Sequence, residues 1–390
     1  MKLLLYSWGA YLQQDIKQIL TDSTIEYREF QWVFEDRNND EKLEKWFKDN
    51  IDASSFDAIL SVNYWPVLSK IANDNNIKYI AWCYDNPFDL TDVESTLGNP
   101  CNYVFLFDRI QMEGYKKQGF DTVYHLPLGV NEKRLANIQI TDADRKKYTA
   151  DVSLVGSLYE SEYQNIVNVL DDKSKGFVDA VMLSQQQIYG AFLVDKVITS
   201  EFIDEVNKKI KESHPKTKFV LPREALIWAM ASELTRKDRL SLLALLGKRC
   251  DTHLYSFHNM DGILKDVKCS GAIDYVTEMP KVFALSKVNL NPMLRIIQSG
   301  VSLRAFDIMG CGGLLLSSYQ PELAELFVDG QEMVMYSSIE DAIAKTEFLL
   351  QNEGVRERIA QAGREKVLTN FTLSQRFNEI CRICTLRRFT

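Results

Sequence analysis

The first 130 residues alternate between short apolar runs and longer amphipathic stretches, and this alternation limits the folds open to the chain. The apolar runs are rich in β-branched and aromatic residues, which predicts strands at 2–7, 25–30, 56–62, 77–84, 103–107 and 122–127. The stretches between them carry apolar residues three and four positions apart, the spacing of a helix with one buried face. Strands that alternate with helices form a parallel sheet covered on both faces. Residues 1–130 are therefore predicted to form a Rossmann-like domain.

The rest of the chain predicts a second domain of the same class. Residues 131–150 are polar and without periodicity, as in a linker, and the run DVSLVG then starts a domain over 151–370. Further strands are expected at 252–256, 287–290, 314–317 and 333–336. Residues 160–248 show helical patterns and no convincing strand, so they are predicted to be a helical insertion. Residues 371–390 are predicted to be a C-terminal helix, with a crossing back to the first domain as one option. The expected class is α/β, with two Rossmann-like domains facing across a cleft.

Charge and cysteine content narrow the function further. The chain has 46 Lys and Arg against 54 Asp and Glu, a formal charge of −8, so neither a nucleic-acid partner nor a membrane surface is expected. No apolar run reaches the 18 residues of a membrane span, and the apolar stretch at the start of the sequence is too short for a signal peptide. Seven cysteines in apolar surroundings suit a reducing compartment, and we expect a cytoplasmic protein.

The segment 289–336 has the features of an anion site. A strand ends at Asn291, a loop reaches Ser299 and Gly300, and a predicted helix follows. A helix N-terminus behind a glycine offers unpaired N–H groups and a positive dipole end, which suit a phosphate or diphosphate. Arg304 is expected to bind phosphate oxygens, and Asp307, three residues later, to hold a ribose hydroxyl pair. The alternative is ordinary capping, an internal ion pair and a tight turn into the next strand.

Other candidates follow predicted strands. Gly9 lies in the small-residue loop after the first strand, and Asp85 follows the fourth strand, where a carboxylate can accept the proton of a substrate hydroxyl group or orient that group. The alternative for Asp85 is an Asp-Asn-Pro turn. In the second domain Gly156, Ser157 and Tyr255 lie at strand ends and are expected among the ligand contacts. The alternative for Gly156 is a plain glycine between a strand and a loop.

Several segments together carry a resemblance to one known protein family. The most specific is SGVSLRAFDIMGCGGLLLSSYQPELAELFVDGQEMVMY, followed by RERIAQAGREKVLTNFT. Upstream, YIAWCYDNPFDL, YVFLFDR, GFDTVYHLPLGVN and DVSLVGSLYE follow in the order of that family. Together these segments resemble the CgeB-like glycosyltransferases, which are related to retaining glycosyltransferase family 4. The resemblance covers most of the chain outside the insertion and implies the GT-B fold.

The resemblance also implies an activity. The chain is expected to transfer a sugar from a nucleoside diphosphate donor to a hydroxyl acceptor, with retention, without a cofactor and without a metal. Asp142 and Asp144 spell D-A-D but lie in the polar linker, so no metal site is predicted there. Related enzymes carry two glutamates eight positions apart. Asp307 matches the second, but Ser299 stands at the first. Arg304 and Asp85 are the expected catalytic residues.

Three alternatives remain open at this point. One is a non-catalytic nucleotide-sugar or glycan-binding protein on the same fold, and another is a glycosyltransferase for modified DNA bases, which the acidic charge disfavours. A Rossmann oxidoreductase would need G-x-G-x-x-G after the first strand, where this chain has SWGAYL. Part of the insertion is expected to wall the acceptor side or to form a homodimer contact.

Overall fold

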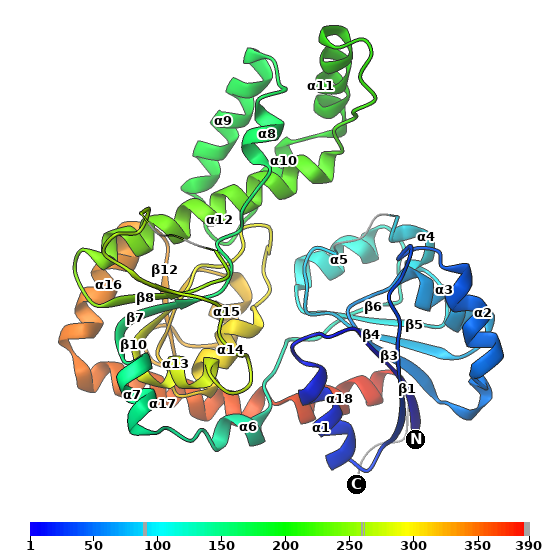
Figure 1. The fold of residues 1–390 in the computed structure, drawn as a ribbon, viewed down its shortest axis with the longest axis horizontal. Coiled ribbons are helices and arrows are strands. Elements are labelled where there is room, and N and C mark those ends of the chain that lie inside the picture. The colour runs from blue at the N-terminus through cyan, green and yellow to red at the C-terminus, as the bar shows by residue number, and fades with distance from the viewer. Residues whose placement is uncertain (89–91, 259, 261, 386–390) are drawn as a thin grey trace. The chain divides into compact units, whose positions relative to one another are not determined.

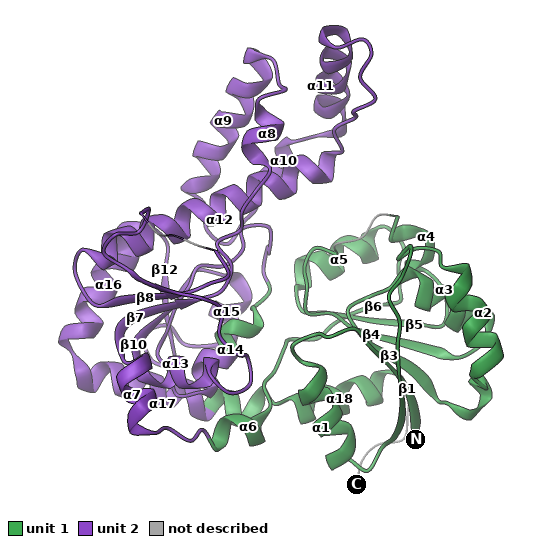
Figure 2. Ribbon diagram, viewed as in Figure 1, with its two compact units in different colours: residues 1–137, 300–306, 366–390 green, residues 138–299, 307–365 purple. Residues whose placement is uncertain are grey.

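The computed structural model describes residues 1–88, 92–258, 260 and 262–385 of the 390-residue chain. The chain divides into two compact units, coloured separately in Figure 2. The first unit is made of residues 1–137, 300–306 and 366–390, and the second of residues 138–299 and 307–365. In the described parts of the chain, no helix is long and apolar enough to cross a bilayer.

The first unit is built on a sheet of six parallel strands in the order β2-β1-β3-β4-β5-β6. The strands are β1 Lys2–Ser7, β2 Glu26–Gln31, β3 Ala58–Val62, β4 Lys78–Trp82, β5 Asn102–Leu106 and β6 Val123–His125. All five residues of β3 are buried, as expected for a central strand covered on both faces. The intervening helices are α1 Gln13–Asp22, α2 Glu41–Asn50, α3 Pro66–Asp74, α4 Glu94–Leu97, α5 Arg109–Lys117 and α6 Glu132–Ala136.

The predicted strand at 77–84 is two residues too long at its end. β4 ends at Trp82, because the side-chain carbonyl of Asn63 accepts the backbone N–H groups of Tyr84 (2.9 Å) and Asp85 (3.2 Å). Asn63 itself has a positive φ of 62°, which brings the end of β3 toward this turn. A side chain thus replaces the next strand pairing.

The C-terminal helix α18, Leu373–Ile383, lies in the first unit. Phe377 stacks on Trp82 with 6.5 Å between ring centroids, and the ammonium of Lys78 donates to the carbonyl of Cys384 at 2.8 Å. Cys381 and Cys384 are both fully buried free thiols on this apolar face. The basic residues Arg387 and Arg388 lie outside the described residues.

The second unit contains another sheet of six parallel strands, in the order β12-β11-β10-β7-β8-β9. They are β7 Ala150–Val155, β8 Thr252–Tyr255, β9 Lys268–Ser270, β10 Ser286–Asn291, β11 Leu315–Ser318 and β12 Val334–Tyr336. The helices are α7 Asp142–Tyr148, α13 Met279–Leu285, α14 Leu303–Gly310, α15 Pro321–Leu326, α16 Ile339–Gln351 and α17 Glu353–Asn370, and the boundary between the units crosses α14 and α17. Two parallel sheets flanked by helices confirm the predicted α/β class.

The insertion consists of helices with a hydrophobic core of their own. α8 Tyr163–Val167, α9 Asp172–Gln186, α10 Leu193–Val197 and α11 Ser200–Ser213 pack around the N-terminal half of α12 Arg223–Gly247 (Figure 1). Leu226, Met230 and Leu234 of α12 belong to that core. Leu243 and Leu246 of the same helix instead pack against the second sheet. α12 is therefore shared between the insertion and the crossover from β7 to β8.

Candidate functional site

The strongest convergence of predicted residues lies where β7 ends. Gly156 has a φ of 145° and donates its N–H to the carbonyl of Tyr255 at the end of β8, 3.0 Å away. A Cβ on Gly156 would lie 3.4 Å from Nη1 of Arg239, which donates to the carbonyl of Ser157. The Arg239 guanidinium also covers the ring of Tyr159, 4.8 Å from its centroid. Arg239 is buried, and its Nε and Nη2 donate to the carbonyl of Pro292 at 3.3 and 2.7 Å, so the guanidinium holds the turn after β7 in place.

Arg239 was missed by the sequence analysis because the insertion separates it from Ser157 by 82 positions. Its signal lies in the run RKDRLSLLALLG, where cations precede an apolar helical pattern. Once the insertion is set aside, this run takes the place of the first helix after β7. Cations at the start of that helix are expected beside the loop that follows the strand.

A second cluster fixes the loop that follows β10. Ser299, which is fully buried, donates its hydroxyl to Oε1 of Glu322 at 2.7 Å, and the N–H of Glu322 returns a bond to the carbonyl of Ser299 at 3.1 Å. Gln320 donates its amide Nε2–H to the carbonyl of Ile297 at 3.0 Å. Residues just after β11 thus hold the loop in place. They also place a buried carboxylate, Glu322, beside the position where a glutamate was expected.

Asn291 and Tyr255 lie at strand ends, as predicted, but their side chains are buried. The Asn291 amide donates to Oγ of Ser317 at 3.0 Å. The Tyr255 ring packs on Tyr148, with 6.3 Å between centroids, and burial raises its pKa to about 12. Tyr255 meets Gly156 through its backbone carbonyl. A ligand contact at either residue stays a prediction.

Helix α14 carries the predicted diphosphate and ribose residues. Gly300 approaches Phe107 so closely that a Cβ would lie 2.7 Å from its ring and 2.8 Å from its carbonyl oxygen, so only glycine fits. Arg304 is half-buried and is the second residue of α14. In the second unit, Asp307 is buried and accepts the hydroxyl of Tyr275 at 3.3 Å. Their contacts to a donor remain predictions.

Gly9 and Asp85 follow β1 and β4 of the first sheet. Gly9 is exposed with a φ of 88°. Asp85 is exposed, and its carboxylate accepts the amide of Asn63 at 2.5 Å. The peptide bond between Asn86 and Pro87 is cis. Asp85 therefore takes part in a turn, and the catalytic role predicted for it is untested.

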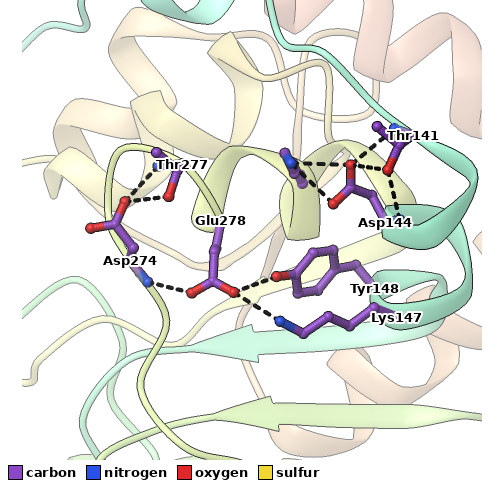
Figure 3. Close-up of polar contacts among 8 residues, drawn as sticks. Thr141, Asp144, Lys147, Tyr148, Asp274, Thr277 and Glu278 are labelled. Atoms are coloured by element: carbon purple, nitrogen blue, oxygen red, sulfur yellow. Dashed lines mark hydrogen bonds and ion pairs between the residues drawn. The ribbon is translucent and has the colours of Figure 1, made fainter.

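The D-A-D sequence of residues 142–144 caps a helix (Figure 3). Asp144 accepts the backbone N–H of Thr141 at 2.9 Å and its hydroxyl at 2.7 Å, and the ammonium of Lys281 at 3.0 Å. These bonds lower the pKa of Asp144 to about 2, with the backbone bond as the main cause. Within the described residues, no three metal-ligating side chains are clustered.

Glu278, also in Figure 3, ties α13 to α7. It accepts the backbone N–H of Asp274 at 3.0 Å, the hydroxyl of Tyr148 at 2.5 Å and the ammonium of Lys147 at 2.9 Å. These bonds lower its pKa from 4.5 to about 2, the backbone bond first. Because the folded pKa lies below the unfolded one, Glu278 stabilises the fold above pH 4.5, and this contribution is lost as the pH falls through 2.

Glu278→Gln should therefore cost most stability above pH 4.5 and progressively less between pH 4.5 and 2. Urea unfolding at pH 7, 4.5 and 3 measures the difference from the wild type. A difference that does not change with pH would show that the charge of Glu278 contributes nothing.

Comparison with known proteins identifies the architecture. Residues 236–382 match a family model described as Glycosyl transferase-like. Sucrose-phosphate synthase from Thermosynechococcus elongatus is similar in structure, with a TM-score of 0.55, 12% identity and 98% of each chain covered. Anabaena HepE in complex with UDP-glucose is similar with a TM-score of 0.55 and 11% identity, and 99% of each chain is covered. WaaG, a glycosyltransferase involved in lipopolysaccharide biosynthesis, is similar with a TM-score of 0.53 and 12% identity, and 98% of this chain and 99% of WaaG are covered. No curated protein matches in sequence.

The chain therefore has the GT-B fold of glycosyltransferases, as the sequence predicted. The segment that matches the Glycosyl transferase-like family runs from the cations of α12 through β8 and α14 to α18.

Proposed function

We propose that the protein is a glycosyltransferase that moves a sugar from a nucleoside diphosphate donor to a hydroxyl acceptor. The observation that carries the proposal is the cluster at the end of β7. There Gly156 has a φ of 145°, which favours glycine, and the guanidinium of Arg239 fixes the backbone of Ser157 beside it. In open α/β sheets, ligands bind outside the carboxyl ends of the strands, where this cluster lies. The family match over 236–382 supports the same activity.

The proposed roles follow from position. Gly156 and Ser157 face the diphosphate with their backbone, Arg304 at the start of α14 binds its oxygens, and Asp307 holds the ribose hydroxyls. Positive groups aimed at a leaving diphosphate stabilise the charge that grows as the glycosidic bond breaks. For Asp85 we keep the role of orienting the acceptor hydroxyl.

The finer parts of the proposal rest on the resemblance to CgeB-like enzymes. They are a hexosyl donor, retention at the anomeric carbon, and a reaction that needs neither metal nor cofactor. We also propose a cytoplasmic location, which agrees with seven cysteines that are all free thiols.

Thermal unfolding with a panel of nucleotide sugars tests the proposal. A ligand present at 100 times its Kd stabilises the fold by about 2.7 kcal/mol, a shift that is easily measured. The stabilising donor should then be consumed with release of nucleoside diphosphate, and EDTA should leave that rate nearly unchanged. Binding without turnover would favour a non-catalytic nucleotide-sugar-binding protein. A complete loss of turnover in EDTA, restored by Mn²⁺ or Mg²⁺, would contradict metal independence. The absence of binding by any donor would overturn the proposal.

A further inference from the structure

The insertion lines a small pocket at the carboxyl ends of β10 and β11. The pocket is bounded by residues 188–191 of the insertion, by the loop after β10 at Arg295, and by the loop after β11 at Gln320. It holds about 240 Å³ of empty space, part of it open to solvent, and little of that space is wide enough for a water molecule. The pocket therefore accommodates one water or one small polar group.

The insertion wall of the pocket is fixed to the second unit by several contacts. The Ile188 carbonyl accepts Nη1–H of Arg295 at 2.7 Å, and the Arg295 guanidinium lies 3.8 Å from the ring centroid of Tyr189. Gly190 has a φ of 74°, and a Cβ there would lie 2.6 Å from ring atoms of Tyr319. No larger side chain fits at that position without displacing the Tyr319 ring.

Two buried polar atoms of the lining residues have no hydrogen-bond partner. Nε of Arg295 donates to Asp238 at 2.6 Å and Nη1 donates to Ile188, which leaves Nη2 unpaired. Gln320 uses its Nε2–H on the carbonyl of Ile297, which leaves Oε1 unpaired. Because Gln320 donates to that carbonyl, its amide is oriented with the acceptor oxygen left over. Unpaired donors and acceptors are costly when buried, so these two atoms call for a small polar partner.

We propose that this pocket binds one hydroxyl group of the donor sugar. A hydroxyl oxygen accepts a hydrogen bond from Nη2 of Arg295 and donates its own hydrogen to Oε1 of Gln320. A carboxylate at that position has no hydrogen for Oε1, so the pocket selects a neutral sugar. One water takes the same place in the free protein. The inference rests on the proposed function, and it makes residues 188–191 of the insertion part of the sugar-binding surface.

Titration calorimetry with UDP, UDP-glucose and the 2-, 3-, 4- and 6-deoxy analogues of UDP-glucose tests the proposal on the wild-type protein. One deoxy position should bind about tenfold more weakly than UDP-glucose, because it leaves both protein atoms unpaired. Equal affinity for all four analogues would overturn the proposal that this pocket binds a sugar hydroxyl, while leaving the proposed function intact. If the thermal panel selects another nucleotide sugar as the donor, the same comparison is made with the deoxy analogues of that sugar, and equal affinity for all of them would overturn the proposal.

The variant Gln320→Leu separates a direct contact from a structural effect. The variant should bind UDP-glucose more weakly than the wild type does but bind UDP equally well. The deoxy analogue that binds weakly to the wild type should lose no further affinity in the variant. Gln361→Leu makes the same chemical change at an exposed position of α17, where the side-chain amide donates to Oε1 of Glu365 at 2.7 Å, and this variant should bind both ligands like the wild type. If Gln320→Leu keeps the full deoxy sensitivity, the proposal is wrong. Should that variant fail to fold, Gly190→Ala provides a second test, because displacement of the Tyr319 ring should lower the affinity for UDP-glucose and leave the affinity for UDP unchanged.

Discussion

Replacing Arg304 with alanine should lower kcat/KM for sugar transfer by about 10²- to 10³-fold, the range seen when one preorganised donor to a developing anion is removed. Arg304 is the second residue of α14 and is half-buried, so its charge is only partly screened by solvent. The effect should appear mainly in kcat, because the negative charge on the diphosphate grows as the sugar departs. Steady-state kinetics with the donor selected by the thermal panel measures it.

Arg358→Ala is the matched control. Arg358 is exposed on α17, and its removal should leave both kcat and the unfolding temperature unchanged. If Arg304→Ala unfolds at the wild-type temperature and transfers sugar at the wild-type rate, then α14 does not bind the leaving group. Its arginine would then have the purely structural role that the sequence left open.

Replacing Asp238 with alanine should lower the free energy of unfolding by about 3–5 kcal/mol, the usual cost of removing one partner of a buried ion pair. Asp238 and Arg295 have side-chain exposures of 9% and 7%, with Oδ2 and Nε 2.6 Å apart. Burial is strong enough to raise the pKa of Asp238 even though the guanidinium opposes it. Without the carboxylate, the Arg295 charge stays buried and uncompensated. Urea unfolding monitored by tryptophan fluorescence measures the loss.

Two further variants show whether the charge is responsible. Asp172→Ala removes an exposed carboxylate in the first turn of α9 and should change stability by no more than about 0.5 kcal/mol. Asp238→Leu combined with Arg295→Met should recover much of the stability, because two apolar residues leave no buried charge. A double variant as unstable as Asp238→Ala would show that the pair acts through shape and hydrogen bonds instead.

The fold followed from local patterns because each strand of the parallel sheets is a short apolar run between amphipathic helices. β9 escaped prediction because Lys268–Ser270 is a three-residue edge strand with exposed ends and no apolar run. The polar stretch 131–150, predicted to be a linker, contains α6 and α7. These helices directly follow the capping residues Asn131 and Thr141. α12 was assigned wholly to the insertion, since sequence periodicity does not reveal that one helix serves two hydrophobic cores.

The site was predicted less completely, because its contacts join residues far apart in the chain. Counting eight positions back from Asp307 led to Ser299 and to an absent carboxylate. The structure instead brings in a carboxylate from Glu322, 23 residues further on. Arg239 reaches Ser157 across 82 residues, and Arg295 meets Ile188 across 107. Only the packing of the insertion against the sheet determines these pairs.

The continuity of α12 has a mechanical consequence. Its 25 residues span about 37 Å. Between Arg223 and Leu246 the helix contains neither proline nor glycine, the residues at which helices usually bend. Its N-terminal half is held in the core of the insertion, while Arg239, further along, holds the backbone of Ser157. The helix therefore acts as a stiff lever, and a tilt imposed on the insertion reaches the turn after β7 without being absorbed on the way.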